Sequence, residues 1–168
     1  GKLATDEEVA AQIRRMLEDP KLRKPRILGF FREYFEYGGA MDVFKDEALN
    51  RNHVPEVLVS DTDRLILHFY EQDRDVLREL LTTNKSFVQY GIDSKTKKPT
   101  RAQARNLGAH LAYSLPPDWK WIPEQPVALP GSQRAGILTQ PAWLVAKSGN
   151  FDNDAIQRGL WVRGKLLG

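Results

Sequence analysis

Three histidines and several paired carboxylates are the residues of this 168-residue chain that could do chemistry. His53, His68 and His110 lack the spacing of a helical metal site, in which two histidines four residues apart enclose a glutamate. Asp61 precedes His68 by about two helical turns, so a helix could turn the carboxylate and the imidazole to one face. A histidine at a helix surface or in an internal hydrogen bond is the commoner outcome. His68 and His110 are the candidates for a cofactor site.

The sequence Ser60-Asp61, followed by His68, also suggests a hydrolytic triad. The nucleophile elbow Gly-x-Ser-x-Gly is absent, and a serine before an aspartate is typical of a helix N-terminal cap. We therefore expect Ser60 or Asp61 to cap a helix. No catalytic residue is predicted, and whether the chain belongs to an enzyme stays open.

The segment from Asn150 to Asp154 contains enough oxygen atoms to suggest a calcium site. It lacks the repeated Asp-x-Asp-x-Asp-Gly pattern and the final glutamate of a calcium loop. No metal is predicted in this chain, and Asp152 and Asp154 are the candidates to check.

Composition limits the function further. Hydrophobic residues make up 41% and charged residues 28%, as in ordinary globular proteins, and there is no cysteine for disulfides, thiolate chemistry or covalent haem attachment. No apolar run is long enough to span a membrane.

Charge is unevenly distributed along the chain. Residues 1–84 carry 13 basic against 17 acidic side chains, and residues 85–168 carry 12 basic against 5 acidic. Without a nucleic-acid motif, this asymmetry favours contact between lobes, or with the rest of a longer polypeptide, over binding of nucleic acid.

Amphipathic spacing predicts helices in the first half of the chain. Thr5 and Glu8 form a capping box for a helix that Asp19-Pro20 should end. A second helix is expected from Pro25 to Gly38-Gly39, and a third from about Ser60 to Leu81 with a break or cap near Asp73. The apolar positions are Val9, Ile13, Met16 and Leu17 in the first helix, Phe30, Phe31, Tyr34 and Phe35 in the second, and Leu65, Ile66 and Phe69 in the third. The aromatic cluster of the second helix should lie in the core.

The second half alternates loops and helices. Phe87–Tyr90 is strand-like, Asp93–Thr100 is a lysine-rich loop, and a capping box at Thr100 begins a helix to Tyr113. Two closing helices are expected, from Pro141 to Lys147 and from Asp152 or Asp154 to Leu167. Gly159 and Gly164 in the last of them should permit close approach of a neighbouring element.

Five prolines and two tryptophans make residues 115–131 an extended connection. Trp119 and Trp121 should pin it to the helices, and they are also the candidates for ligand binding. The predicted fold is all-α, an irregular multi-helix bundle with this long proline- and tryptophan-rich connection. The parts are a helical module (1–90), the loop, helix and connection (91–131) and a helical pair (132–168), joined in one compact unit.

Two stretches carry a family resemblance. Residues 26–46, with 61–68 and 75–83, resemble domain of unknown function 1592, and residues 134–148, with 158–168, resemble the start of domain of unknown function 1588. These domains occur in tandem in large proteins of planctomycetes and related bacteria.

The resemblance implies an exported, periplasmic or otherwise extracytoplasmic protein whose full length carries c-type haem. The haem-attachment motif itself is absent from this chain.

The leading hypothesis is a non-catalytic scaffold or docking module, whose partners are the remaining domains of the parent. One alternative is the wall of a haem-dependent redox site, with His68 or His110 as a ligand or proton-transfer group and Trp119, Trp121, Trp143 and Trp161 lining a pocket. Another is an anion- or glycan-binding domain.

Overall fold

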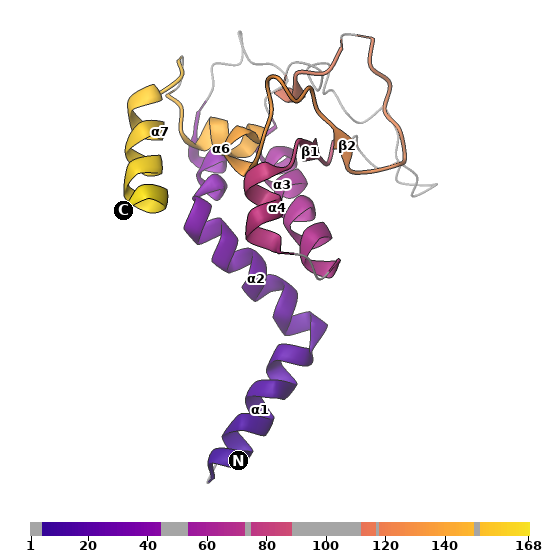
Figure 1. Cartoon of the computed structure of the whole chain (residues 1–168), viewed down its shortest axis with the longest axis vertical. Helices are drawn as coiled ribbons and strands as arrows, with labels where there is room; N and C mark the ends of the chain where they lie inside the picture. Colours follow the sequence, from indigo (N-terminus) through magenta and orange to yellow (C-terminus); the bar gives the residue numbers. More distant parts are fainter. Residues whose placement is uncertain (1–4, 45–53, 73–74, 89–111, 117, 150–151) are drawn as a thin grey trace.

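The computed structural model of this protein describes residues 5–44, 54–72, 75–88, 112–116, 118–149 and 152–168 (Figure 1). Helices predominate in it, which confirms the predicted all-α class. The elements in chain order are α1 (Asp6–Glu18), α2 (Pro20–Phe35), the 3-10 helix η1 (Tyr37–Asp42), α3 (Pro55–Glu71), α4 (Val76–Thr82), β1 (Lys85–Ser86), β2 (Val127–Ala128), the 3-10 helix η2 (Ile137–Thr139), α6 (Pro141–Ala146), α7 (Ala155–Val162) and the π-helix η3 (Arg163–Leu167).

The start of α1 is as predicted, and the start of α2 is not. The Thr5 hydroxyl accepts from the Glu8 N–H at 3.2 Å, while the Glu8 carboxylate accepts from the Thr5 N–H at 3.1 Å, so the capping box is confirmed. Asp19 ends α1 and caps α2 through the Lys21 N–H at 2.9 Å. The Asp19 cap therefore starts α2 at Pro20, and the predicted first residue, Pro25, lies inside the helix.

The end of α2 also differs from the prediction. Glu36 ends the helix in the left-handed region with φ 58°, and Gly38 and Gly39 continue into η1. Gly39 faces α6, where an added Cβ would lie 3.8 Å from the Cβ of Ala146. Gly39 thus lies where η1 packs on α6, and neither glycine ends α2.

Helix α3 lies at the centre of the body, in contact with α2, η1, α4, α6 and β1. It begins at Pro55, whose missing N–H is harmless at a first helical position, so Ser60 and Asp61 lie inside the helix and do not cap its N-terminus. Leu65, Ile66 and Phe69 are buried, as predicted. Of the aromatic cluster on α2, Phe31 and Phe35 are buried and Tyr34 is half-buried, but the Phe30 side chain is 60% exposed.

The elements after α3 are shorter than the sequence suggested. Asp75 caps α4 through the Arg78 N–H, whereas the predicted cap, Asp73, is outside the described residues. β1 precedes the predicted strand 87–90 and pairs with β2, Lys85 opposite Ala128 and Ser86 opposite Val127. The predicted loop 93–100 and the helix from Thr100 lie outside the described residues, except for Ala112 and Tyr113, which are helical.

A tight approach of two segments occurs at Gly136, not at the glycines predicted for it. An added Cβ at Gly159 or Gly164 would meet nothing within 4 Å, whereas one at Gly136 would collide with the carbonyl group of Leu81. Gly136 has φ +70°, and its N–H donates to the Thr83 carbonyl oxygen at 2.6 Å. This contact fixes the end of α4 against the segment that leads into η2.

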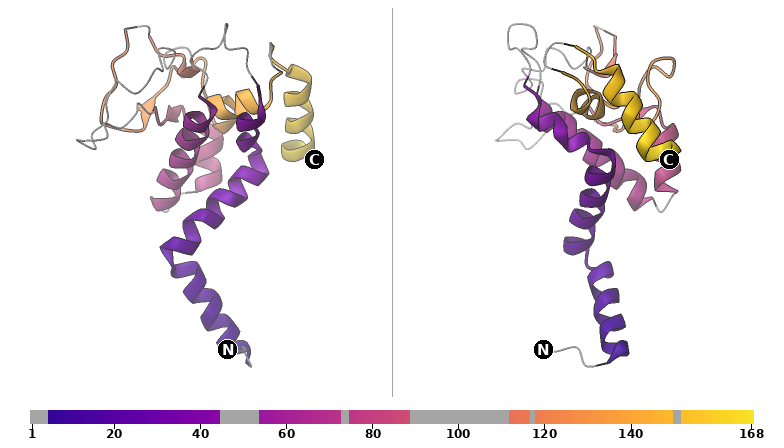
Figure 2. Two further views of the ribbon diagram at one scale, coloured as in Figure 1. Left: turned by 180° about the vertical axis from the view of Figure 1, so that it is seen from behind. Right: turned by 90° about the vertical axis from the view of Figure 1, so that its left-hand side faces the viewer.

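The described helices divide into a body and an extension. Helix α1 and the first part of α2 run away from the body and carry the N-terminus to its far tip, while α7 lies along one side of the body (Figures 1 and 2). Helix α1 contacts α2, and most of its described side chains are exposed.

Candidate functional site: the buried carboxylates of α3

Two aspartates on α3, Asp61 and Asp63, are the most deeply buried carboxylates among the described residues. Asp61 is 1% exposed and Asp63 8%. Successive positions on a helix are about 100° apart, so the two carboxylates point away from each other and meet different partners. Burial of an ionised carboxylate is costly unless hydrogen bonds or an opposite charge compensate it, which makes those partners informative.

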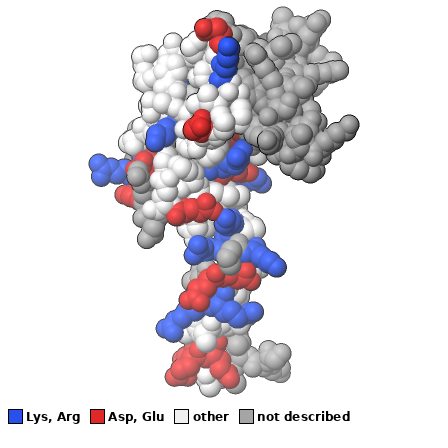
Figure 3. All heavy atoms as spheres, turned by 90° about the vertical axis from the view of Figure 1, so that its right-hand side faces the viewer, with Lys and Arg blue, Asp and Glu red and all other residues white. Residues whose placement is uncertain are grey.

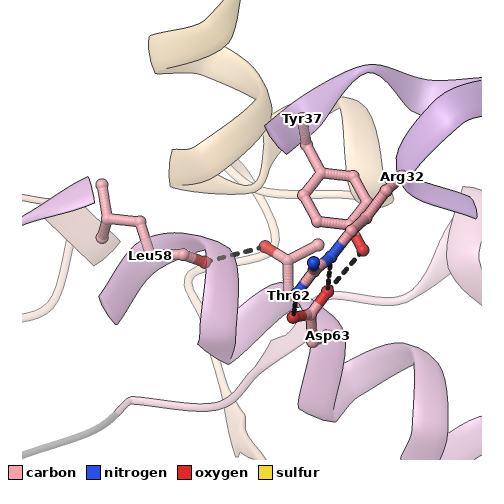
Figure 4. Close-up of polar contacts among 5 residues, drawn as sticks. All are labelled: Arg32, Tyr37, Leu58, Thr62 and Asp63. Atoms are coloured by element: carbon pink, nitrogen blue, oxygen red, sulfur yellow. Dashed lines mark hydrogen bonds and ion pairs between the residues drawn. The ribbon is translucent and has the colours of Figure 1, made fainter. Parts of the chain in front are cut away.

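The Asp63 carboxylate is fully engaged by residues of α2 and η1 (Figure 4). The Arg32 guanidinium donates from Nε to Oδ1 at 2.9 Å and from a terminal nitrogen to Oδ2, which is the two-pronged geometry of a strong arginine–carboxylate pair. The Tyr37 hydroxyl donates to Oδ1 at 2.7 Å. Next to it, the Thr62 hydroxyl donates to the Leu58 carbonyl oxygen at 3.1 Å. Asp63 thus joins α3 to the end of α2.

Asp61 makes the corresponding link to the other half of the chain. The buried Tyr113 hydroxyl donates to its Oδ2. Burial, then the charge of Asp61, raises the pKa of Tyr113. Burial, then the hydrogen bond to Asp63, likewise raises the pKa of Tyr37. Both phenols therefore stay protonated and act as hydrogen-bond donors, so neither serves as a base near neutral pH.

His68 lies half-buried on α3, one turn before the helix end. Its Nε2 lies 2.8 Å from Nε2 of Gln72, and its ring makes edge contacts with Phe69 and Phe87. Its neighbours thus include a side-chain amide and two phenyl rings, and Asp61 accepts a hydrogen bond from Tyr113. The second candidate, His110, lies outside the described residues, as does His53.

The four tryptophans occupy two places. Trp119 and Trp121 are half-buried against the core, and the Trp121 indole donates to the Val88 carbonyl oxygen at 2.9 Å, so they pin the connection to the body as expected. Trp143 of α6 and Trp161 of α7 are buried edge to face, with ring centroids 5.5 Å apart. Trp161 also stacks on Phe35. Trp143 and Trp161 therefore pack α7 against α6 and α2.

Two arginines of the C-terminal stretch bind backbone carbonyl groups rather than acids. Arg134 donates to the carbonyl oxygens of Thr139 and Ala112, at 2.7 and 2.8 Å, and burial lowers its pKa. Arg158 donates to the carbonyl oxygens of Lys147 and Leu144, at 3.1 and 2.9 Å, where α6 ends. Both satisfy carbonyl groups that a helix or turn leaves without partners. The sequence marks these arginines only as members of the stretches that resemble domain of unknown function 1588.

A third polar cluster surrounds Glu36, the left-handed residue after α2. Its carboxylate accepts from Lys147, whose side chain is 11% exposed, and lies 3.9 Å from Nζ of Lys165. The Tyr34 hydroxyl donates to the Lys165 carbonyl oxygen at 3.1 Å. Glu36 therefore connects the end of α2 with α6 and η3, a role for which the sequence offers no signal.

The metal candidates have local roles. The Asp154 carboxylate caps α7 through the Gln157 N–H at 2.8 Å, and the Asp152 carbonyl oxygen accepts from the Gly149 N–H at 2.9 Å. No group of three or more histidine and acidic residues in the described ranges could hold a metal ion. No described helix is both long and apolar enough to cross a bilayer.

In contrast to these engaged polar groups, large apolar side chains are exposed on several elements. Seven large apolar side chains are more than half exposed. They are Ile13 in α1, Phe30 in α2, Met41 in η1, Phe44 just after η1, Ile156 and Leu160 in α7, and Leu167 in η3. Scattered exposed apolar residues are normal, but stripes of them at helical spacing mark interaction surfaces.

Comparison with known protein families places the chain in one family. Residues 1–93 match the family described as PSD4, protein of unknown function (DUF1592). The chain belongs to this family. No curated protein and no solved structure matches the chain significantly. The matched DUF1592 region contains Arg32, Tyr37 and Asp63, so this partly buried ion pair belongs to the family region of the chain. The resemblance of residues 134–168 to domain of unknown function 1588 stays a prediction.

Proposed function

We propose that this DUF1592 chain is a non-catalytic helical docking module of an exported, multidomain c-type-haem protein. The observation that carries the proposal is a contrast between its polar and apolar side chains. Among the described residues, the buried carboxylates and the arginines join elements of the body, whereas large apolar side chains of α1, α2, η1 and α7 are exposed. The haem connection and the extracytoplasmic location rest on the family resemblance.

Each polar cluster is explained by a contact within the chain. Asp63 joins α3 to α2 and η1, Glu36 joins α2 to α6 and η3, and Arg158 closes the end of α6. Each of these charged groups already has a partner within the chain. A surface that buries Phe30 or Phe44, which are 60% and 68% exposed, would instead gain about 1.5–3 kcal/mol for each fully buried side chain.

The alternative, that this chain forms the wall of a haem-dependent redox site, has less support than docking. Trp143 packs on Trp161, which also stacks on Phe35, and the neighbours of His68 include Gln72, Phe69 and Phe87. The haem-ligand role of His110 stays a prediction. Neither the glycan-binding nor the redox-wall hypothesis has an observation of its own that favours it over docking.

The test uses the longer parent polypeptide, in which Phe44 is replaced by aspartate. We expect the c-type haem absorbance to be retained and limited proteolysis to cut the variant faster between this module and its neighbours. Lys120→Glu, an exposed change outside the apolar surfaces, is the control and should digest like the natural protein. Unchanged digestion of the Phe44→Asp parent contradicts docking. Loss of redox turnover in a His68→Gln parent of unchanged digestion would favour the redox wall.

A further inference from the structure

We propose that the outer face of α7 and η3 binds an anionic lipid surface. Its apolar side chains, Ile156, Leu160 and Leu167, enter the boundary between the headgroups and the acyl chains, and its basic side chains, Arg163 and Lys165, meet the lipid phosphates. The inference goes beyond the proposed docking role, because it gives α7 and η3 a partner outside the parent polypeptide.

An apolar stripe covers the outer side of α7 and continues into η3. Ile156 and Leu167 are each 77% exposed, and Leu160 is 63% exposed. Intervals of four and seven residues bring these side chains to one face of a helix. The inner side of α7 is already buried, since Trp161 packs on Trp143. The packing of α7 on the body therefore explains the inner face only, and the outer stripe needs a second apolar partner.

The charge of these two elements has a single sign. Together they contain three basic residues and no acidic one. Arg158 is used within the chain, where it donates to carbonyl groups at the end of α6. Arg163 is exposed and has no ion-pair partner among the described residues, and the Lys165 ammonium lies 3.9 Å from the Glu36 carboxylate. Basic side chains beside an apolar stripe are typical of helices that lie at an anionic lipid surface.

The same composition continues onto α2 next to η3. The Tyr34 hydroxyl donates to the Lys165 carbonyl oxygen at 3.1 Å, and the Phe30 ring stacks on Tyr34 with centroids 6.1 Å apart. Phe30, which is 60% exposed, thus lies one helical turn from the contact between α2 and η3. One turn further along α2, Arg26 is exposed and has no ion pair within the part of the chain that the structure describes.

Acidic side chains occur only at the edges of this region. Asp152 and Asp154 precede α7, at the end of the helix opposite to η3. Glu33 is the one acidic residue of α2. We therefore expect the C-terminal half of the face, from Leu160 onward, to lie closest to the lipid, and Glu33→Gln to strengthen the binding.

The position of α7 favours a lipid surface over a protein partner. Helix α7 lies along one edge of the body when the molecule is seen from the front and from behind, so the stripe is on the outside of a single helix (Figures 1 and 2). Lipids supply acyl chains and anionic headgroups along the whole of such a helix, whereas a protein would need an apolar groove bordered by acids. Helix α1 lacks this character, because acidic and basic side chains alternate along the extension (Figure 3).

Co-sedimentation with vesicles tests the proposal on the 168-residue chain. We expect binding to vesicles that contain phosphatidylglycerol to be about tenfold or more tighter than binding to phosphatidylcholine alone, and to weaken as salt is added. Leu160→Glu should weaken it by about tenfold or more, and Arg163→Ala by roughly fivefold. The matched controls are Leu77→Glu on α4, where the leucine is 47% exposed, and Lys120→Ala; both should bind like the natural chain.

Single cysteines locate the face in contact with lipid, because the natural chain has no cysteine. A polarity-sensitive fluorophore attached to Leu160→Cys or Leu167→Cys should emit at shorter wavelength when phosphatidylglycerol vesicles are added. The same fluorophore on Ile13→Cys in α1 or Leu77→Cys in α4 should not change. Equal changes at all four positions overturn the assignment to α7 and η3.

Failure to bind anionic vesicles, or equal binding to both kinds of vesicle, overturns the proposal. Binding that neither Leu160→Glu nor Arg163→Ala weakens also overturns it, since the face then takes no part. Unchanged circular dichroism of both variants shows that weaker binding is not a loss of folding. If the chain ignores vesicles but Leu160→Glu speeds cleavage of the parent between this module and its neighbours, the face binds protein and the docking role stands.

Discussion

At the residue scale, the buried carboxylates of this protein accept hydrogen bonds from nearby side chains. Arg32 and Tyr37 compensate the Asp63 charge, and Tyr113 compensates Asp61. Gly136 supplies both a left-handed φ and the space that the Leu81 carbonyl group occupies. Three predictions follow from these single positions.

Gly136→Ala should destabilise the fold by about 2–4 kcal/mol, because an alanine there is strained and its Cβ collides with the Leu81 carbonyl group. Gly159→Ala is the matched control: it lies in α7 with open space around it, and it should stabilise the protein by about 0.5–1 kcal/mol. Urea unfolding followed by circular dichroism measures both. Equal effects of the two substitutions would contradict this account of Gly136.

Arg32→Ala should cost about 1–3 kcal/mol. It leaves the nearly buried Asp63 carboxylate with Tyr37 alone, and the cost is reduced because the Arg32 side chain is 48% exposed. Arg32→Ala combined with Asp63→Leu should recover part of this loss, since the uncompensated charge is then gone. Thermal unfolding of the single and double variants provides the comparison. A double variant less stable than Arg32→Ala would be the contrary result.

Alkaline unfolding should begin above about pH 10, the ordinary pKa of tyrosine. The pKa values of Tyr37 and Tyr113 are raised in the folded state by burial and by their aspartate partners. The unfolded chain therefore loses these protons first, so the stability they contribute is complete below pH 10 and falls as the pH rises further. Each tyrosine contributes a slope of up to about 1.4 kcal/mol per pH unit. Tyr37→Phe should lower the measured slope of unfolding free energy against pH.

At the element scale, capping side chains and side-chain hydrogen bonds to backbone carbonyl groups set where the short helices begin and end. Asp19, Asp75 and Asp154 cap α2, α4 and α7 through side-chain oxygens. Arg158 satisfies the end of α6, and Glu36 ends α2 in a left-handed conformation. These contacts join elements that are too short to be stable alone.

Glu36→Gly should destabilise the protein by about 2 kcal/mol. The substitution relieves a left-handed penalty of about 1 kcal/mol, but it removes the partner of the nearly buried Lys147 ammonium. Adding Lys147→Met should recover much of the loss, because methionine needs no counter-charge there. Chemical denaturation of the three proteins measures the effect. Failure of the second substitution to restore stability would show that the Lys147 charge is not the cause.

At the scale of the whole molecule, stability is unevenly distributed. Helix α3 is surrounded by other elements and contributes Leu65, Ile66 and Phe69 to the core, whereas α1 extends from the body with its apolar stripe exposed (Figure 1). An isolated helix of 13 residues is marginally stable in water.

Amide hydrogen exchange of dilute protein should therefore be fast in α1 and slow in α3. Equal protection of the two helices in dilute solution would contradict the distribution described here.

The sequence by itself determined the all-α class, the capping box of α1, the two closing helices and the pinning role of the connection, because these depend on local spacing, caps and proline geometry. It misplaced the starts of α2 and α3, since the Asp19 cap and Pro55 outweighed the signals at Pro25 and Ser60. Only the tertiary structure decided that Asp61 and Asp63 are buried and engaged, that Gly136 rather than Gly159 lies at a close contact, and that the stripe of α1 is exposed. Those outcomes depend on residues distant in sequence, and a helical period fixes which side chains share a face but not what that face meets.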